Sequence, residues 1–179
     1  MRLQNGRKIQ IPKWDLIIAH PPCTYLSSVA TRQHSARMTA ENRIEGRTIQ
    51  RIRAMDFFMR CIQAPCEHIA VENPVGVMNT VFRKPDQIID PYQFAESVDD
   101  TENYVTKRTC LWLKGLQPLA INHLTKPDNR SIWGVYTNEK SKCWEDTSTR
   151  DTGERSKTFP GIARAMAQQW GDYMMEVLA

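Results

Sequence analysis

Two short apolar segments separated by a long helical pattern constrain the fold of this chain more than any other feature of its sequence. The segments WDLIIAH (residues 14–20) and HIAVENP (residues 68–74) each have the length and composition of one buried β-strand. Between them, apolar residues recur at roughly helical spacing over residues 41–62, which predicts an amphipathic helix. A strand, a helix and a strand in this order form a βαβ unit, which favours a parallel sheet with a right-handed crossover.

The rest of the chain is less regular until its C-terminal end. Prolines punctuate residues 83–94, and the acidic stretch that follows them predicts an exposed loop. Residues 107–115 regain strand character, whereas the polar residues 125–157 predict either a mobile binding loop or a weakly ordered insertion. The C-terminal segment predicts a helix packed on the core. Its apolar face is formed by Ile162, Met166, Trp170 and either Met174 or Val177.

The length of the chain predicts a single domain, and the strand and helix patterns make it an α/β domain. Of the 179 residues, 41% are hydrophobic, which suffices for a core without covalent staples. Residues 1–13 are expected to be a short lead-in to the first strand, and no apolar run has the length of a membrane span or an export signal. The five cysteines show no disulfide framework, so a reducing, cytoplasmic setting is expected.

Arginine is concentrated in one part of the chain. The segment from residue 32 to residue 53 carries six arginines and two glutamates, and it accounts for the whole net charge of +4. A planar guanidinium group makes paired hydrogen bonds to phosphate oxygens, so the cluster is consistent with binding to a nucleic-acid backbone. A solvated helix face explains the charge equally well. The six are Arg32, Arg37, Arg43, Arg47, Arg51 and Arg53.

Unusual residues follow both predicted strands, at the edge where parallel sheets bind ligands. The first strand ends at His-Pro-Pro-Cys (residues 20–23) and the second at Glu-Asn-Pro (residues 72–74). Two successive prolines restrict the backbone and hold Cys23 at the tip of its strand. A lone cysteine is usually a buried apolar filler. A cysteine near a carboxyl group nevertheless suggests covalent catalysis, since a thiolate is a strong nucleophile and the carboxyl group can supply or remove a proton.

These corners resemble motifs of the carbon-5 cytosine DNA methyltransferases. DLIIAHPPCTYLS resembles their catalytic motif, in which a Pro-Cys dipeptide follows a strand, and VENPVGVM resembles their Glu-Asn-Val motif. Together with PDQIIDPYQF, KRTCLWLKGL and SKTFPGIARAMAQQWG, the pattern over residues 13–171 is similar to small methyltransferase-like proteins of bacteriophages and prophages. The resemblance implies a truncated Rossmann-like fold of the S-adenosylmethionine-dependent methyltransferases, with a mostly parallel sheet. It also implies a link to DNA methylation and restriction-modification in the host cytoplasm.

The resemblance implies roles for individual residues. Cys23 matches the nucleophile that attacks carbon 6 of a cytosine flipped out of DNA, and Glu72 matches the acid that engages ring nitrogen 3. Asn73 would brace the loop, Pro21 would contact the cofactor S-adenosylmethionine, and Arg108 would contact the base or a phosphate. No metal is implied. The residues expected to bind DNA are Arg32, Arg37, Arg43, Arg47 and Lys107.

The chain departs from the family pattern in three places. Cys110 stands where a second arginine is expected, and Thr24 stands where the larger enzymes have glutamine. Only thirteen residues precede Trp14, which leaves no room for the usual half that binds S-adenosylmethionine. The chain is therefore expected to be part of a longer or split enzyme, with a second chain supplying the donor pocket. Alternatively, it keeps the fold as an inactive DNA-binding or anti-restriction protein.

Two other functions fit parts of the sequence. Amino-group methyltransferases carry Asp or Asn, two prolines and an aromatic residue at the same strand end, but here His20 and Cys23 replace both diagnostic side chains. Cys61, Cys66 and His68 lie close in sequence, but their irregular spacing does not match a zinc site.

Overall fold

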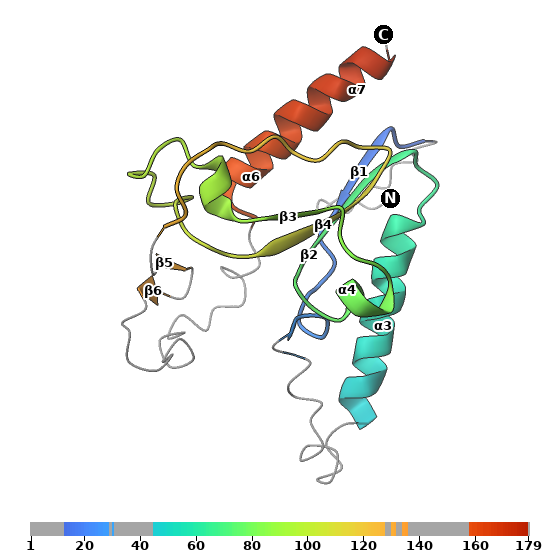
Figure 1. Cartoon of the computed structure of the whole chain (residues 1–179). Helices are drawn as coiled ribbons and strands as arrows, with labels where there is room; N and C mark the ends of the chain where they lie inside the picture. Colours follow the sequence, from blue (N-terminus) through green and yellow to red (C-terminus); the bar gives the residue numbers. More distant parts are fainter. Residues whose placement is uncertain are drawn as a thin grey trace, which may run out of the picture. The chain divides into compact units, whose positions relative to one another are not determined.

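The computed structural model describes residues 13–28, 30, 45–127, 130–131, 134–135 and 158–178 (Figure 1). The described chain is an α/β protein with a four-stranded open sheet. It divides into two compact units, one formed by residues 1–86 and 111–116 and the other by residues 87–110 and 117–179. Each unit therefore combines segments that are distant in sequence.

The first unit contains the predicted strand–helix–strand segment. Strand β1 spans Leu16–Ala19, helix α3 spans Glu45–Ile62 and strand β2 spans His68–Pro74. The two strands pair in parallel, with Leu16 opposite His68 and Ala19 opposite Val71, which confirms the βαβ arrangement. The start of the predicted helix, residues 41–44, lies outside the described residues.

The sheet is mixed, so the prediction of a mostly parallel sheet is wrong. Its strand order is β1-β2-β4-β3, and only β1 and β2 are parallel. Strand β3 spans Gln87–Ile89 and strand β4 spans Thr109–Lys114. Parallel neighbours need a crossover of a dozen or more residues, usually a helix. The fully described stretch between β2 and β4 forms only two four-residue helices, α4 (Met78–Val81) and η1 (Pro91–Phe94). A Rossmann-like fold stays a prediction.

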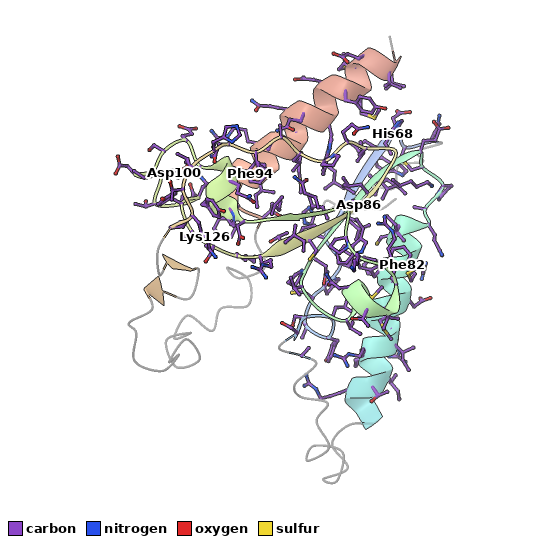
Figure 2. All side chains as sticks on the ribbon, in the orientation of Figure 1. His68, Phe82, Asp86, Phe94, Asp100 and Lys126 are labelled. Carbon is purple, nitrogen blue, oxygen red and sulfur yellow. The ribbon has the colours of Figure 1, made fainter. Side chains whose placement is uncertain are left out.

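Aromatic residues from different elements form the core of the first unit. Phe58 of α3 and Trp112 of β4 are both fully buried, and their ring centroids lie 5.0 Å apart in an edge-to-face arrangement. Phe82, labelled in Figure 2, makes a second edge contact with Phe58 at 6.2 Å. The indole N–H of Trp112 donates to the carbonyl of Arg83, so this buried polar group is satisfied. These contacts attach α3 and the end of α4 to β4.

The second unit contains the C-terminal helix with its predicted apolar face. Helix α6 (Pro160–Ala165), a π-helical turn η2 (Met166–Trp170) and helix α7 (Gly171–Leu178) follow one another without a break. A spacing of four residues drifts by about 40° per step around an ideal α-helix. The wider π turn offsets this drift and keeps the apolar side chains on one side. Of the predicted apolar face, Ile162, Met166, Trp170 and Met174 are buried, whereas Val177 is exposed.

A buried amide fixes the start of α6. The side chain of Asn103 is buried, its Oδ1 accepts the backbone N–H of Gly161 at 2.8 Å, and its Nδ2 donates to the Asp100 carboxylate at 3.0 Å. A Cβ atom at Gly161 would lie 2.5 Å from the carbonyl oxygen of Phe94, so only glycine fits there.

Two short strands, β5 (Arg130–Ser131) and β6 (Gly134–Val135), form a separate antiparallel pair. They belong to residues 125–157, most of which lie outside the described residues, as do residues 1–12. The predictions of a mobile insertion and of a lead-in segment therefore remain predictions. In the described ranges, no helix is long and apolar enough to cross a membrane.

An ion pair reinforced by the backbone joins the end of α4 to β4. Arg83 Nη2 lies 2.8 Å from Asp86 Oδ2, and the backbone N–H of Leu113 donates to the same oxygen at 2.6 Å. Figure 2 labels Asp86. Burial by itself raises the pKa of Asp86, but the hydrogen bonds from Arg83 and Leu113 and the charge of Arg83 outweigh burial and lower this pKa.

We expect acid to weaken the folded state partly through Asp86. Because the folded-state pKa of Asp86 lies below its unfolded value, its contribution to stability is complete above about pH 4 and is lost as the pH falls through the folded-state pKa. Asp86→Asn should lower the free energy of unfolding at neutral pH by about 1 kcal/mol, because the pair is partly exposed and screened. It should also reduce the loss of stability between about pH 6 and about pH 3, as measured by urea denaturation.

The control for this prediction is Asp99→Asn, which changes an exposed carboxyl group of the loop after η1. It should leave the acid sensitivity of the wild type unchanged. Equal acid sensitivity of the wild type and Asp86→Asn would contradict the prediction that Asp86 contributes to the loss of stability in acid.

Candidate active site

The ends of β1 and β2 lie side by side, which brings the two unusual corners of the sequence together. The paired residues of the two strands are 52 positions apart along their whole length. In the same register, the next two pairs are His20 with Glu72 and Pro21 with Asn73. Backbone pairing cannot continue through Pro21 and Pro22, because proline has no N–H group. Side chains connect the two segments instead.

Each of these two pairs is joined by one hydrogen bond. His20 Nδ1 lies 2.9 Å from Glu72 Oε2, and Asn73 Nδ2 donates to the carbonyl oxygen of Pro21 at 2.7 Å. Successive side chains of a strand point to opposite faces, and the exposures agree with this. The side chains of His20 and Glu72 are 37% and 19% exposed, whereas Pro21 and Asn73 are buried. The corner is therefore fastened on both faces.

Asn73 leaves one of its polar atoms without a partner. Its Oδ1 is buried and accepts no hydrogen bond from any residue in the described ranges. The opposite orientation of the amide would bring two oxygen atoms together at Pro21, so the orientation with Nδ2 toward Pro21 is favoured. A buried acceptor without a partner costs about 1–3 kcal/mol. Within the described ranges the side chain of Asn73 thus makes one hydrogen bond, to Pro21, and this bond supports its predicted bracing role.

Cys23 begins a tight turn just beyond the two prolines. The backbone N–H groups of Leu26 and Ser27 both donate to the carbonyl of Cys23 at 3.0 Å. The thiol belongs to a half-buried residue and not to the hydrophobic core. The backbone of Cys23 is therefore held by the two prolines that precede it and by the turn that follows it.

The residues after this turn pair with the residues after β2. The backbone N–H of Ser28 donates to the carbonyl of Val75 at 3.0 Å, and that of Val77 donates to the carbonyl of Leu26 at 2.8 Å. These bonds surround a short antiparallel bridge. A Cβ atom at Gly76 would lie 1.9 Å from the carbonyl oxygen of Leu26. This close approach of two backbones therefore requires glycine at position 76.

Two arginines of α3 contact the same turn. Arg51 Nε donates to the carbonyl of Tyr25 at 3.1 Å, and the guanidinium of Arg47 lies 5.5 Å from the centre of the Tyr25 ring. Burial lowers the pKa of Arg51, and the positive charge of Arg47 lowers it further. The site thus combines the Cys23 thiol of this turn with the Glu72 carboxyl group of β2 and two arginines of α3.

Arg108 and Lys107 belong to the second unit. Lys107 Nζ lies 5.4 Å from the centre of the Phe159 ring, and Arg108 is exposed. Burial raises the pKa of Asp90, and the backbone N–H of Lys107 and the charge of Arg108 oppose this rise. The roles of Arg108 at the base and of Lys107 on DNA stay predictions.

The described structure covers part of the site predicted from the sequence. It brings Pro21, Cys23, Glu72 and Asn73 to one corner of the first unit. Three residues expected to bind DNA lie outside the described ranges: Arg32, Arg37 and Arg43. Sequence reasoning assigned no role to His20 or Tyr25. Their contacts involve residues far along the chain, and only the strand register and the placement of α3 reveal them.

No group of three or more His, Cys, Asp or Glu side chains is arranged to bind a metal ion in the part of the chain that is described. The thiol of Cys66 donates to the carbonyl of His68 at 3.2 Å. Burial raises the pKa of the Cys61 thiol, and the charge of Arg60 opposes the rise only in part. Both cysteines are therefore suited to packing.

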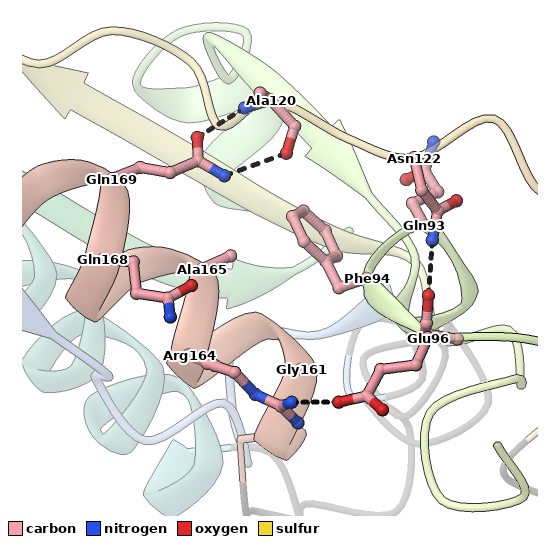
Figure 3. Close-up of a pocket in the computed structure, with 11 residues that line it drawn as sticks. Gln93, Phe94, Glu96, Ala120, Asn122, Gly161, Arg164, Ala165, Gln168 and Gln169 are labelled. Atoms are coloured by element: carbon pink, nitrogen blue, oxygen red, sulfur yellow. Dashed lines mark hydrogen bonds and ion pairs between the residues drawn. The ribbon is translucent and has the colours of Figure 1, made fainter.

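A cavity of ≈ 250 Å³ lies in the second unit, lined by residues of η1, α6 and η2 (Figure 3). Its polar groups are mostly used within the protein. Gln169 exchanges two hydrogen bonds with the backbone of Ala120, and Arg164 pairs with Glu96. Few polar atoms are left to select a ligand, so the corner at the ends of β1 and β2 is the better candidate.

The fold and the corner together define an α/β protein with a cysteine and a glutamate at the ends of two parallel strands. The chain matches no family model, no curated protein and no solved structure. Its function is therefore inferred from the geometry of the corner and from the chemistry of its side chains.

We expect Gly76→Ala to destabilise the corner. The added methyl group would collide with the Leu26 carbonyl, and relief of such overpacking costs about 1–3 kcal/mol of unfolding free energy. Gly46→Ala is the matched control in the same unit, because a Cβ atom there meets nothing within 4 Å and alanine favours a helix. Urea denaturation measures both variants. Equal stability of Gly76→Ala and the wild type would contradict the close backbone approach.

Proposed function

We propose that the chain is a DNA cytosine-5 methyltransferase-like protein in which Cys23 adds covalently to carbon 6 of cytosine. The observation that carries this proposal is the corner where two side-chain hydrogen bonds join the His-Pro-Pro-Cys and Glu-Asn-Pro segments. A thiol and a carboxyl group at one edge of a sheet are the two groups that such an addition requires. The resemblance of both segments to the family motifs points to the same chemistry.

The addition uses a nucleophile and a proton donor. As the Cys23 thiolate attacks, a carbon–sulfur bond forms at carbon 6 and the double bond between carbons 5 and 6 moves to carbons 4 and 5. Ring nitrogen 3 takes the proton of the Glu72 carboxyl group. The product is an enamine whose carbon 5 is nucleophilic and accepts an electrophile. Return of the proton on ring nitrogen 3 to Glu72, loss of the proton at carbon 5 and departure of the thiolate then restore the aromatic ring.

S-adenosylmethionine is the methyl donor that the resemblance implies, and when bound it would supply the methyl group to carbon 5. The described side chains of the corner are a carboxyl group, an imidazole, a thiol and a buried amide, and the carbonyl of Pro21 is taken by Asn73. This set does not match the adenosine or methionine portions of the donor. The proposal for this chain's own residues is therefore the addition at carbon 6. A donor pocket supplied by a second chain is consistent with it.

The arginines beside the turn suit a DNA substrate. A cytosine inside a duplex must be flipped out before a thiol can reach carbon 6, and the flanking phosphates then need positive charge. Arg47 and Arg51 both contact Tyr25, two residues after Cys23. Phosphate binding at these arginines would therefore be coupled to the turn that carries the nucleophile.

A reversible addition predicts a reaction that needs no methyl donor. While sulfur is bound at carbon 6, carbon 5 takes a proton from water, and reversal exchanges the original hydrogen with solvent. DNA labelled with tritium at cytosine carbon 5 should therefore release tritium when mixed with the purified chain. Cys23→Ser should reduce this release to background. Cys61→Ser changes another half-buried cysteine of the same unit and should retain the wild-type rate.

A second readout traps the adduct. When a methyl donor and the chain that binds it are both supplied, DNA containing 5-fluorocytosine should form a covalent complex with the wild type, because the fluorine cannot leave carbon 5 as a proton does. Cys23→Ser should lose this complex and keep its circular dichroism spectrum. An adduct or tritium release that survives in Cys23→Ser rules out this nucleophile. DNA binding by a wild type that shows neither reaction would favour the inactive DNA-binding alternative.

We expect Arg47→Gln and Arg51→Gln to weaken DNA binding regardless of sequence. The plot of log K against log salt concentration has a negative slope, and removal of one phosphate-binding side chain should make it less steep by about 0.9 on duplex DNA. Fluorescence anisotropy over a series of salt concentrations measures the slope. Arg164→Gln alters an exposed arginine of the second unit and serves as the control. Slopes unchanged from the wild type in both α3 variants would contradict the phosphate role.

A further inference from the structure

We propose that His20 is a positioning residue that orients the carboxyl group of Glu72 toward the pyrimidine ring. The inference rests on the proposed function and extends it to a residue that has no role in the implied mechanism. Its basis is the hydrogen bond of 2.9 Å between His20 Nδ1 and Glu72 Oε2.

The strand register makes this contact a consequence of the fold. Ala19 lies opposite Val71 in the parallel pair, so the next residues, His20 and Glu72, leave the two strands at the same level. Residues paired across two strands have their side chains on the same face of the sheet. The side chain at position 20 is therefore the one in register with Glu72.

The backbones of His20 and Glu72 are both anchored, which distinguishes this hydrogen bond from an ordinary surface pair. Exposed ion pairs contribute little when two long side chains must first be ordered. Here Pro21 restricts the backbone of His20, and the buried side chain of Asn73 holds the carbonyl of Pro21 at 2.7 Å. Asn73 also directly follows Glu72 in β2. The His20–Glu72 bond thus joins two backbones that are already fastened together on the opposite face.

The hydrogen bond from His20 limits the directions in which the Glu72 carboxyl group can point, which matters for a glutamate that must engage ring nitrogen 3. The backbone of Glu72 is fixed by β2, but its flexible side chain can place the carboxyl group in several directions. A donor on Oε2 fixes the plane of the carboxyl group and leaves Oε1 for the ring. Reaction rates depend strongly on such alignment. His20 does not need to touch the pyrimidine to have this effect.

Two substitutions test the positioning role in the tritium-release assay with the full chain and saturating DNA. His20→Leu removes the donor, whereas His20→Asn keeps an amide N–H close to the place of Nδ1. We expect His20→Leu to lower the release rate about tenfold or more, as expected for loss of a hydrogen bond to a carboxyl group. His20→Asn should recover most of the wild-type rate. DNA affinity should be unchanged in both variants.

A double variant separates positioning from a general structural effect. Glu72→Gln should slow release by itself, and His20→Leu should add little in that background, because no carboxyl group remains to be oriented. Equal effects of His20→Leu in both backgrounds would make the role structural and overturn the inference. His20→Asn as slow as His20→Leu would also overturn it, in favour of proton transfer by the imidazole.

The outcome for the wild type distinguishes the two proposals. If the wild type releases tritium and His20→Leu releases it at the same rate, the positioning role alone is wrong. If the wild type releases none, the proposed function fails and the role of His20 fails with it.

Discussion

Two consecutive prolines at the end of β1 determine how the candidate site is built. Pro21 and Pro22 cannot donate to the ladder that pairs β1 with β2, so the backbone pairing stops at Ala19 and Val71. The register does not stop there. The side chains of Glu72 and Asn73 take over the role of the missing backbone bonds, one on each face of the sheet. The chain therefore leaves β1 along a defined path, and Cys23 starts its turn from a fixed point.

The turn that follows is held by contacts from other parts of the first unit. Backbone bonds tie it to the segment around Gly76, and Arg51 of α3 holds the carbonyl of Tyr25. A reactive side chain is useful only when its surroundings keep it aligned, and buried hydrogen bonds provide this alignment better than a free loop. The second unit also contains a buried asparagine that bonds to the backbone, because Asn103 accepts the N–H of Gly161 at the start of α6. There, however, the polar groups around the cavity mostly satisfy one another.

Local patterns predicted the elements well where regular structure is long. The strand at residues 68–74 appears with the predicted limits, the predicted helix ends at residue 62 as expected, and the C-terminal helix buries the expected side chains up to Met174. Strand β3 was missed because three residues between prolines carry no periodic signal. The prediction of a mostly parallel sheet was wrong because it extended the parallel direction of one βαβ unit to the whole sheet. The direction of a strand depends on the connection that precedes it, and no long helix precedes β3 or β4 in the described chain after β2.

The sequence by itself determined the strand–helix–strand order and the residues that stand at the strand ends, because proline restrictions and apolar periodicity act over a few neighbouring positions. It did not determine which of those residues meet. The contacts of His20 with Glu72 and of Asn73 with Pro21 join positions 52 apart, and Arg51 reaches Tyr25 across 26 positions. Such contacts depend on the register of β1 against β2 and on the placement of α3. Tertiary packing alone sets both, because a shift of one residue would give every side chain at the corner a different partner.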